Sequence, residues 1–221
     1  MFQRDHIMRQ IQQVTQALAS ILFKKETQRY YEALQEIDAN GYVLTGLHLA
    51  EVLHLTYDDL IAPLYTAPEV IDPERAALTA ELLRQQGELF RMEGDPERAE
   101  ASQRHALRLY LRVYLSGSAH QSPDTARRIR FLLFDLDWRT LDPTAWPLLF
   151  RFYDHTGAYG EAENVLFAYA ETPLADESLL REGLAFFRRL RAKDPALLAE
   201  GGLPYEEIGE GVRAFRALFG R

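Results

Sequence analysis

The sequence predicts an all-α fold built from antiparallel helix hairpins with short loops. Apolar residues recur with the period of a helix along nearly the whole chain, and alternating runs typical of strands are absent from the sequence. A cap residue followed by proline also recurs, at Asp72, Asp95, Ser122, Asp142 and Asp194. Because a side-chain cap followed by proline at the first helical position is a common helix start, these pairs indicate a series of regularly restarted helices.

The first helix is expected from about Phe2 to Lys25. Its apolar residues follow one another in alternating steps of four and three, which places them on one stripe. The stripe consists of Ile7, Ile11, Val14, Leu18 and Ile21. This pattern favours packing within the chain. The same spacing can join two copies, so a homodimer through this helix remains an alternative, although three heptads are short for a coiled coil.

Glu26–Ala39 is expected to form the second helix and to end at Asn40-Gly41, since these residue types tolerate the left-handed conformation of a helix end. Two short helices and an irregular proline-rich connection should follow: Leu47–Leu53, then Asp58–Leu64 behind a Thr56 cap, then Ala62–Asp72. The later helices are expected at about Pro73–Met92, Pro96–Ser116, Pro123–Trp138, Pro143–His155, Ala158–Glu171, Ala175–Lys193 and Tyr205–Phe219.

Two of these hairpins align with each other. Leu83 falls on Trp146, Phe90 on Tyr153, Gly94 on Gly157, and Ala99 on Ala162. The large residue and the aromatic residue would fill the space between paired helices. The glycine would allow a left-handed turn, and the alanine would let the second helix cross closely. This order is the one expected of a helix-turn-helix repeat.

These positions resemble the tetratricopeptide repeat. The matching residues are Leu83, Gly87, Phe90, Gly94, Asp95, Ala99 and Ala106 in residues 80–113, and Trp146, Leu149, Tyr153, Gly157, Tyr159 and Ala162 in residues 143–171. Phe150 stands where glycine is usual, and Gln103 replaces an aromatic residue. Because the two turn glycines are 157 − 94 = 63 residues apart, which is not a multiple of the repeat of about 34 residues, an irregular helix at Ser122–Trp138 is expected between them.

The whole chain also resembles a family of uncharacterised bacterial proteins with degenerate tetratricopeptide repeats, through Phe2–Arg9, Tyr31–Leu34 and Gly94–Ala99. The resemblance implies an architecture and no known activity. The expected fold is a short, irregular tetratricopeptide-like α-solenoid in a single domain, 1–221. Its parts are N-terminal helices with a degenerate half-repeat at 1–65, clearer hairpins at 73–118 and 143–171, and capping helices at 175–221.

Composition excludes several classes of function. The net charge is −8, with 33 acidic and 25 basic residues, which disfavours a nucleic-acid binder. Two basic stretches, Ala126–Arg130 and Phe187–Lys193, are interpreted as solvated helix faces. Without cysteine the chain cannot form disulfides or thiolate metal sites. Since the sequence contains neither a run of about 20 apolar residues nor a signal peptide at its start, we expect a soluble, cytoplasmic protein without a membrane partner.

Catalytic constellations are not evident. The best metal-like cluster is His48, Glu51 and His54, but two steps of three residues spread the side chains over about 120° of a helix, so ordinary amphipathic placement is favoured. Aromatic pairs at Tyr110/Tyr114, Phe131/Phe134 and Phe186/Phe187 are interpreted as core. Phe150, Phe152 and Tyr153 cover more than one face of their helix, which indicates either a double-sided core position or an exposed binding surface.

The function that the sequence favours is a non-enzymatic scaffold that binds a protein or peptide in the concave groove of the stacked hairpins. The candidate groove residues lie on the first helix of each hairpin and are Glu81, Arg84, Glu88, Arg91, Arg151, Asp154 and His155. No catalytic residue, metal or cofactor is expected. Two alternatives remain: a small-ligand or metal-dependent enzyme with a pocket between the helices, which would need polar residues such as His48, His54 and His155 to converge, and a purely structural module that dimerises through the first helix.

Overall fold

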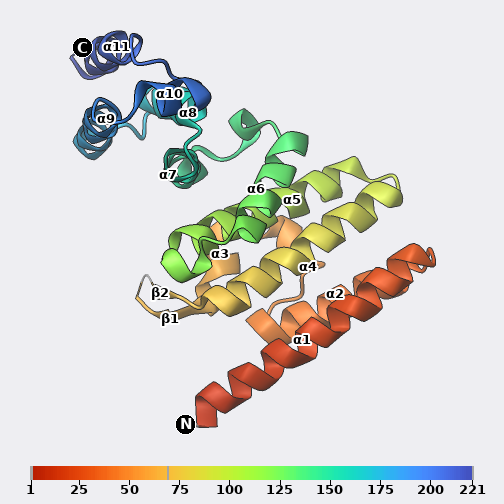
Figure 1. Ribbon diagram of the computed structural model, residues 1–221. Helices are drawn as coiled ribbons and strands as arrows, with labels where there is room; N and C mark the ends of the chain where they lie inside the picture. Colours follow the sequence, from red (N-terminus) through yellow and green to blue (C-terminus); the bar gives the residue numbers. More distant parts are fainter. Residues whose placement is uncertain (1, 69, 221) are drawn as a thin grey trace. The chain divides into compact units, whose positions relative to one another are not determined.

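The computed structural model describes residues 2–68 and 70–220, of which residues 2–7 and 118 are described by their backbone alone, and it is all-α apart from one small hairpin (Figure 1). The chain divides into two compact units, Met1–Asp137 and Trp138–Arg221, called here the N-terminal and the C-terminal unit. Each has its own helix pairs and its own buried residues.

The N-terminal unit contains six α-helices among its described residues: α1 Phe2–Glu26, α2 Tyr30–Thr45, α3 Tyr57–Ile61, α4 Pro73–Met92, α5 Pro96–Leu115 and α6 Pro123–Asp135. Short 3₁₀ turns occur at Val52–His54, Ala62–Leu64 and Ser118–His120. Two strands, β1 Tyr65–Ala67 and β2 Val70–Ile71, pair in antiparallel fashion with Tyr65 opposite Ile71. Helix α1 packs on α2 and α4, α4 on α5, and α5 on α6.

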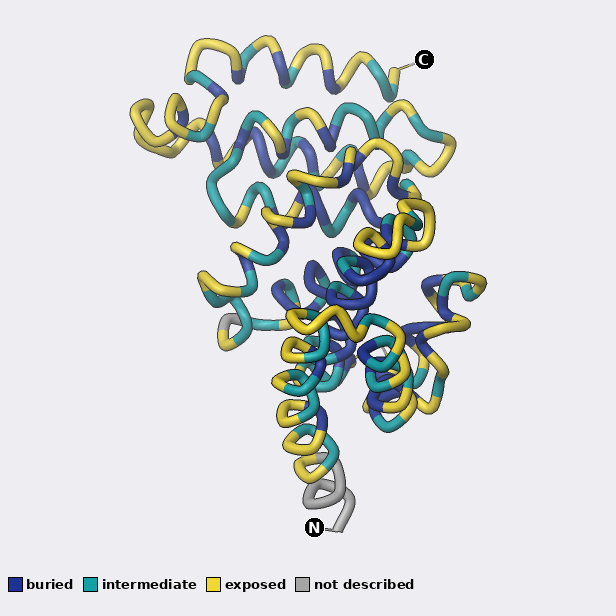
Figure 2. The backbone as a smooth tube through the Cα atoms, turned by 90° about the vertical axis from the view of Figure 1, so that its right-hand side faces the viewer, coloured by how far each residue is buried: buried dark blue, intermediate teal, exposed yellow. Residues whose placement is uncertain are grey.

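The C-terminal unit contains five α-helices among its described residues: α7 Trp146–Thr156, α8 Tyr159–Ala170, α9 Glu177–Leu190, α10 Pro195–Glu200 and α11 Ile208–Phe219. Two 3₁₀ turns, Trp138–Thr140 and Pro143–Ala145, precede them. Helix α7 packs on α8, and α11 packs on both α9 and α8. Buried and exposed residues alternate along α11, the helix that leads to the C-terminus in Figure 2, as expected for an amphipathic helix.

The five predicted caps are confirmed, although Asp142 opens the 3₁₀ turn Pro143–Ala145 and α7 begins only after it, at Trp146. Asp72 accepts hydrogen bonds from the backbone N–H groups of Glu74 and Arg75, and the side chains at the other starts accept equivalent bonds from residues two or three positions further on. Each such cap contributes about 1 kcal/mol of helix stability. These helix starts are therefore specified by short-range chemistry.

The turn glycines of the two aligned hairpins also behave as expected. Gly94 and Gly157 have φ of 81° and 79°, a conformation that favours glycine. Gly87 allows α4 and α5 to approach closely, since a Cβ on it would lie 2.9 Å from the backbone oxygen of Ala99. In the other hairpin Phe150 is buried and its ring packs edge-on against Phe186 of α9, 5.3 Å between ring centroids. Phe152 is buried as well, so these aromatic residues form a double-sided core rather than an exposed surface.

The predicted end of the second helix is wrong. Helix α2 continues through Asn40 and Gly41 and ends at Gly46, whose φ is 73°. Gly41 stays helical because the side chain of Leu49 packs against it, and a Cβ there would lie 2.2 Å from the Leu49 Cγ. The start of α2 is also later than expected, since Gln28, with φ of 59°, separates it from α1.

Other local expectations need smaller corrections. Leu47–Leu53 forms turns and part of a 3₁₀ turn rather than an α-helix, and the connection Ala62–Asp72 contains the β1–β2 hairpin. Helix α6 ends at Asp135, short of the predicted Trp138. Phe131 and Phe134 were expected in the core but are 52% and 88% exposed. Helix α6 presents Ala126, Ile129 and Leu132 to its neighbours, which leaves both rings exposed.

Candidate functional site

One buried carboxylate organises the polar contacts among α4, α5 and α6 of the N-terminal unit. Glu81 of α4 is only 9% exposed and accepts hydrogen bonds from the Tyr110 hydroxyl at 2.6 Å and from Gln85 Nε2 at 2.9 Å. Two guanidinium groups also bind it, Arg84 at 2.6 Å and Arg128 of α6. Four partners thus replace the water that this buried carboxylate has lost.

These contacts continue into a chain of ion pairs across three helices. Arg84 also binds Glu88, one turn further along α4, and Glu88 binds Lys25 of α1. The sequence Lys25–Glu88–Arg84–Glu81–Arg128, called here the ion-pair chain, therefore connects α1, α4 and α6. The helices α1 and α4 that it joins lie side by side in Figure 1, in agreement with their packing contacts.

The pKa values of the ion-pair chain follow from these contacts. Burial alone would raise the pKa of Glu81, but the hydrogen bonds and charge of Arg84, with those from Tyr110 and Gln85, outweigh burial and lower it. For Arg84, burial would lower the pKa, whereas the carboxylates of Glu81 and Glu88 raise it. Burial, followed by the charge of Glu81, raises the pKa of Tyr110, which stays a hydrogen-bond donor. Glu81 and Arg84 are therefore both ionised near neutral pH.

A hollow opens over this network. A cavity of about 390 Å³ is lined by apolar residues of α1 and α4 and by polar residues of α4, α5 and α6, namely Leu18, Leu22, Ala77, Leu78, Glu81, Gln85, Tyr110, Asp124, Thr125 and Arg128. A second cavity of about 260 Å³ is lined by Arg84, Arg127, Arg128 and Phe131. Because Arg128 lines both, we call the two together the groove.

The rim of the groove exposes apolar side chains beside a cation. Leu22 is 42% exposed and Phe131 is 52% exposed. The side chain of Arg127 is 79% exposed although it pairs with Asp124 of the same helix. This combination of solvent-facing apolar groups and an accessible guanidinium is typical of a surface that binds another molecule.

The chain from residue 1 to residue 220 matches the model of a family of unknown function, DUF6483. The chain belongs to this family. No curated protein and no solved structure matches it. The predicted resemblance to a family without an assigned activity is thereby confirmed at the family level. Since membership of DUF6483 brings no residue roles, any function has to be argued from the groove and the other sites of this chain.

The seven predicted groove residues of this DUF6483 chain fall into two sets, four on α4 of the N-terminal unit and three on α7 of the C-terminal unit. Glu81, Arg84 and Glu88 come together in the ion-pair chain, whereas Arg91 binds Asp135 at 2.8 Å and Gln103 at 2.9 Å. Arg151, Asp154 and His155 lie on α7 in the C-terminal unit. Arg151 binds Glu182 of α9 at 2.8 Å, Asp154 binds Arg189 of α9, and His155 is exposed in the last turn.

Sequence reasoning missed the residues that complete the groove and the ion-pair chain. Leu22, Lys25, Arg127, Arg128 and Phe131 lie on α1 and α6, outside the hairpin helix that the repeat pattern singled out. The basic stretch Ala126–Arg130 was interpreted as a solvated face, but Arg128 binds Glu81. The arginines of α6 can be read from the sequence, but their role cannot, because it depends on α6 packing close to Glu81 of α4.

The histidine cluster has a local structural role. His48 lies in a turn rather than on a helix, where its Nδ1 is 2.6 Å from Asp38 Oδ2 and its ring stacks on Tyr42 at 4.9 Å. The hydrogen bond to Asp38, together with that carboxylate's charge, raises the pKa of His48. Within residues 2–68 and 70–220, no group of three or more histidine, aspartate and glutamate side chains is arranged to hold a metal.

The C-terminal unit has an acidic hollow between α8 and α11. It has a volume of about 440 Å³, and its lining includes Glu163, Glu207 and Glu210. Burial, followed by the charge of Glu207, raises the pKa of Glu163 to about 7.

Among the helices described for this chain, none is both long and apolar enough to cross a membrane.

Proposed function

We propose that this protein is a non-enzymatic scaffold that binds a peptide segment of another protein in the groove of its N-terminal unit. The observation that carries the proposal is the exposure of Leu22 and Phe131 beside cavities that already hold a fixed set of charges. An apolar side chain of the partner would fill the hollow, and a carboxylate of the partner would bind Arg127. The partner is therefore an amphipathic segment that carries both apolar and acidic residues.

The proposal includes the finer architecture that the sequence favours. We infer that the helix pairs α1/α2 and α4/α5, followed by α6, are degenerate tetratricopeptide-like repeats stacked as a short, irregular solenoid. Support comes from the pairwise packing in chain order and from the roles of Gly87, Gly94 and Ala99 at α4/α5. In such a stack the first helix of each pair lines the inner face, and here α1, α4 and α6 supply every lining residue of the groove except Tyr110 of α5.

The ion-pair chain supports binding by preorganisation. Arg84 and Arg128 are held by Glu81, and Lys25 is held by Glu88, so these long side chains lose little further freedom when a ligand arrives. Ordering a free side chain of this kind at an interface costs about 0.5–1.5 kcal/mol. A groove in which that cost has been met during folding can bind a short segment with useful affinity.

The experiment is a selection from a random peptide library on the immobilised full-length protein, followed by fluorescence anisotropy with the enriched peptides. We expect enriched sequences that combine apolar and acidic residues. Phe131→Ser and Leu22→Ser should each weaken binding about tenfold, which corresponds to about 1.4 kcal/mol for a lost apolar anchor. Arg127→Glu should weaken binding to a similar extent because it replaces attraction by repulsion.

Arg130→Glu is the matched control, since Arg130 is an exposed arginine of the same helix that does not line either cavity. It should change the dissociation constant by less than about twofold. Peptides whose binding is indifferent to Leu22, Arg127 and Phe131, or a selection that enriches nothing, would rule out the groove as the binding surface.

A further inference from the structure

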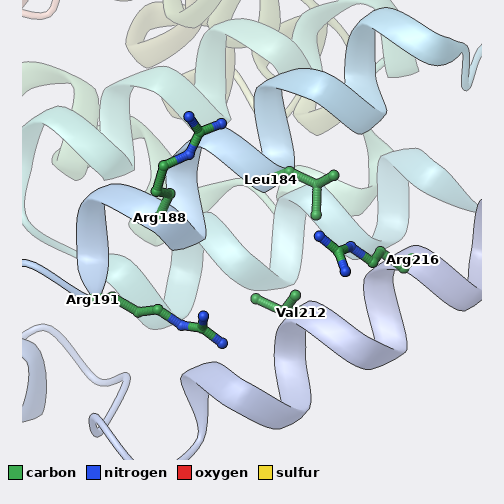
Figure 3. Close-up of a pocket in the computed structure, with 5 residues that line it drawn as sticks. All are labelled: Leu184, Arg188, Arg191, Val212 and Arg216. Carbon is green, nitrogen blue, oxygen red and sulfur yellow. The ribbon is translucent and has the colours of Figure 1, made fainter.

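A basic hollow lies between α9 and α11 in the C-terminal unit, whereas the proposed peptide groove belongs to the N-terminal unit. It has a volume of about 270 Å³ and is lined by Leu184, Arg188, Arg191, Val212 and Arg216. Figure 3 shows the side chains of Arg191 and Arg216 extending from the two helices toward the space around Val212 and Leu184, while Arg188 points outward at the edge. Three cations thus line one small hollow in a chain whose net charge is −8.

These guanidinium groups have no carboxylate partner among the described residues, in contrast to two nearby arginines. Arg189 on the same helix binds Asp154, and Arg151 of α7 binds Glu182 of α9. Within the described part of the chain, the side chains of Arg188, Arg191 and Arg216 form neither an ion pair nor a hydrogen bond. The side of α9 that faces α7 is therefore matched in charge, whereas the side that faces α11 has unbalanced positive charge.

The ends of the two helices explain part of this placement. Arg188 and Arg216 lie in the last turns of α9 and α11, and Arg191 follows the end of α9, where cations are stabilised by the helix dipole. That effect is worth about 0.3–1 kcal/mol for each cation and acts on every side of a helix end. The helix dipole therefore explains why arginines lie at these helix ends. It does not explain why arginines of two helices line the same hollow.

The backbone beneath the hollow is closely packed. Gly183 of α9 lies against the buried ring of Phe215, and a Cβ there would lie 2.3 Å from its Cε1. Gly211 of α11 likewise lies against Phe187, with a Cβ position 2.9 Å from Cε1. Both glycines let the helices approach closely, which fixes the backbone positions from which the arginines extend. The hollow is therefore part of the fold of the unit, and its floor of Leu184 and Val212 is apolar.

We propose that this hollow binds the phosphate group of a small phosphorylated molecule, with the organic part of that molecule resting on Leu184 and Val212. A phosphate monoester carries a charge of about −1.5 to −2 near neutral pH, enough to balance Arg191 and Arg216 together. The guanidinium fork matches phosphate oxygens in paired hydrogen bonds. A carboxylate brings a single charge and would leave one arginine unbalanced. The volume of about 270 Å³ suits a small ligand.

The test is isothermal titration of the full-length protein with three probes: phenyl phosphate, inorganic phosphate and benzoate. Phenyl phosphate should bind most tightly. Inorganic phosphate lacks the apolar contact, and benzoate lacks the second charge. The double variant Arg191→Gln/Arg216→Gln should weaken phenyl phosphate binding at least tenfold, and Val212→Ser should reduce the preference for phenyl phosphate over inorganic phosphate. Circular dichroism confirms that each variant is folded.

Arg213→Gln is the matched control, because Arg213 is an exposed arginine of α11 that does not line the hollow. It should leave phenyl phosphate binding within twofold of wild type. A loss in Arg213→Gln equal to that in the double variant overturns the proposal, as does benzoate binding as tight as phenyl phosphate or no saturable binding at millimolar concentrations. A lipid source is separated by phosphatidylcholine vesicles with and without phosphatidic acid. Vesicle binding that phenyl phosphate fails to displace also overturns it.

Discussion

Glu163 shows how one residue gives the C-terminal unit its own response to pH. Its pKa is raised to about 7 by burial and by Glu207, and Glu210 lines the same hollow. The folded state therefore binds a proton more tightly than the unfolded chain, whose glutamate pKa is about 4.3. The stability that this provides is fully present below about pH 4.3, and it is lost as pH rises through about 7.

Glu163→Gln should remove this dependence, because glutamine stays neutral at every pH. We expect the variant to be more stable than wild type at pH 8 by about 1 kcal/mol, a value reduced from the full shift because the carboxylate is partly solvated. At pH 4 the two proteins should be nearly equal. Urea unfolding at both pH values measures this, with Glu161→Gln, an exposed glutamate of the same helix, as the control. An advantage of equal size at pH 4 and pH 8 would contradict the assignment.

At the scale of elements, replacing glycine by alanine should have opposite effects on stability at Gly183 of α9 and Gly209 of α11. Gly183→Ala places a methyl group 2.3 Å from the ring of Phe215, which is fully buried and cannot move aside. We expect a loss of about 1–3 kcal/mol, typical of overpacking. At Gly209 a Cβ would meet nothing within 4 Å, so Gly209→Ala should stabilise the protein by about 0.5–1 kcal/mol. Urea midpoints compare the two directly. A Gly183→Ala protein as stable as Gly209→Ala would show that the helices are not closely packed there.

The same scale shows what could be predicted from sequence. The caps at Asp72, Asp95 and Ser122 lie where their short-range chemistry indicates, since a cap depends on residues two or three positions away. Asn40-Gly41 carries an equally strong local signal for a helix end, yet α2 passes through it because Leu49 fills the space beside Gly41. Glu81, Arg84 and Glu88 share a face at helical spacing and were predicted as a set. Arg128 and Lys25, which bind them, come from helices whose pairing leaves no local pattern.

At the scale of the molecule, the two compact units can be followed separately by spectroscopy. Both tryptophans, Trp138 and Trp146, lie in the C-terminal unit, with rings 5.4 Å apart in an edge-on arrangement. Leu83→Ala removes a fully buried side chain from the N-terminal unit and should cost about 2–5 kcal/mol there. Its far-ultraviolet circular dichroism transition should move to lower urea while the tryptophan fluorescence transition stays in place. Equal movement of both signals would show that the units unfold as one.

The ion-pair chain also provides a route by which binding in the groove would affect α1. Arg127 and Arg128 are adjacent on α6, so a partner carboxylate that binds Arg127 in the proposed complex also attracts Arg128 and weakens its ion pair with Glu81. The ion pair between Glu81 and Arg84 then becomes stronger, and the ion pair between Arg84 and Glu88 becomes weaker. Glu88 in turn binds Lys25 more strongly, and this ion pair joins the end of α1 to α4. We therefore expect binding of the proposed peptide to hold α1 more tightly, which slower amide hydrogen exchange in the last turns of α1 would report.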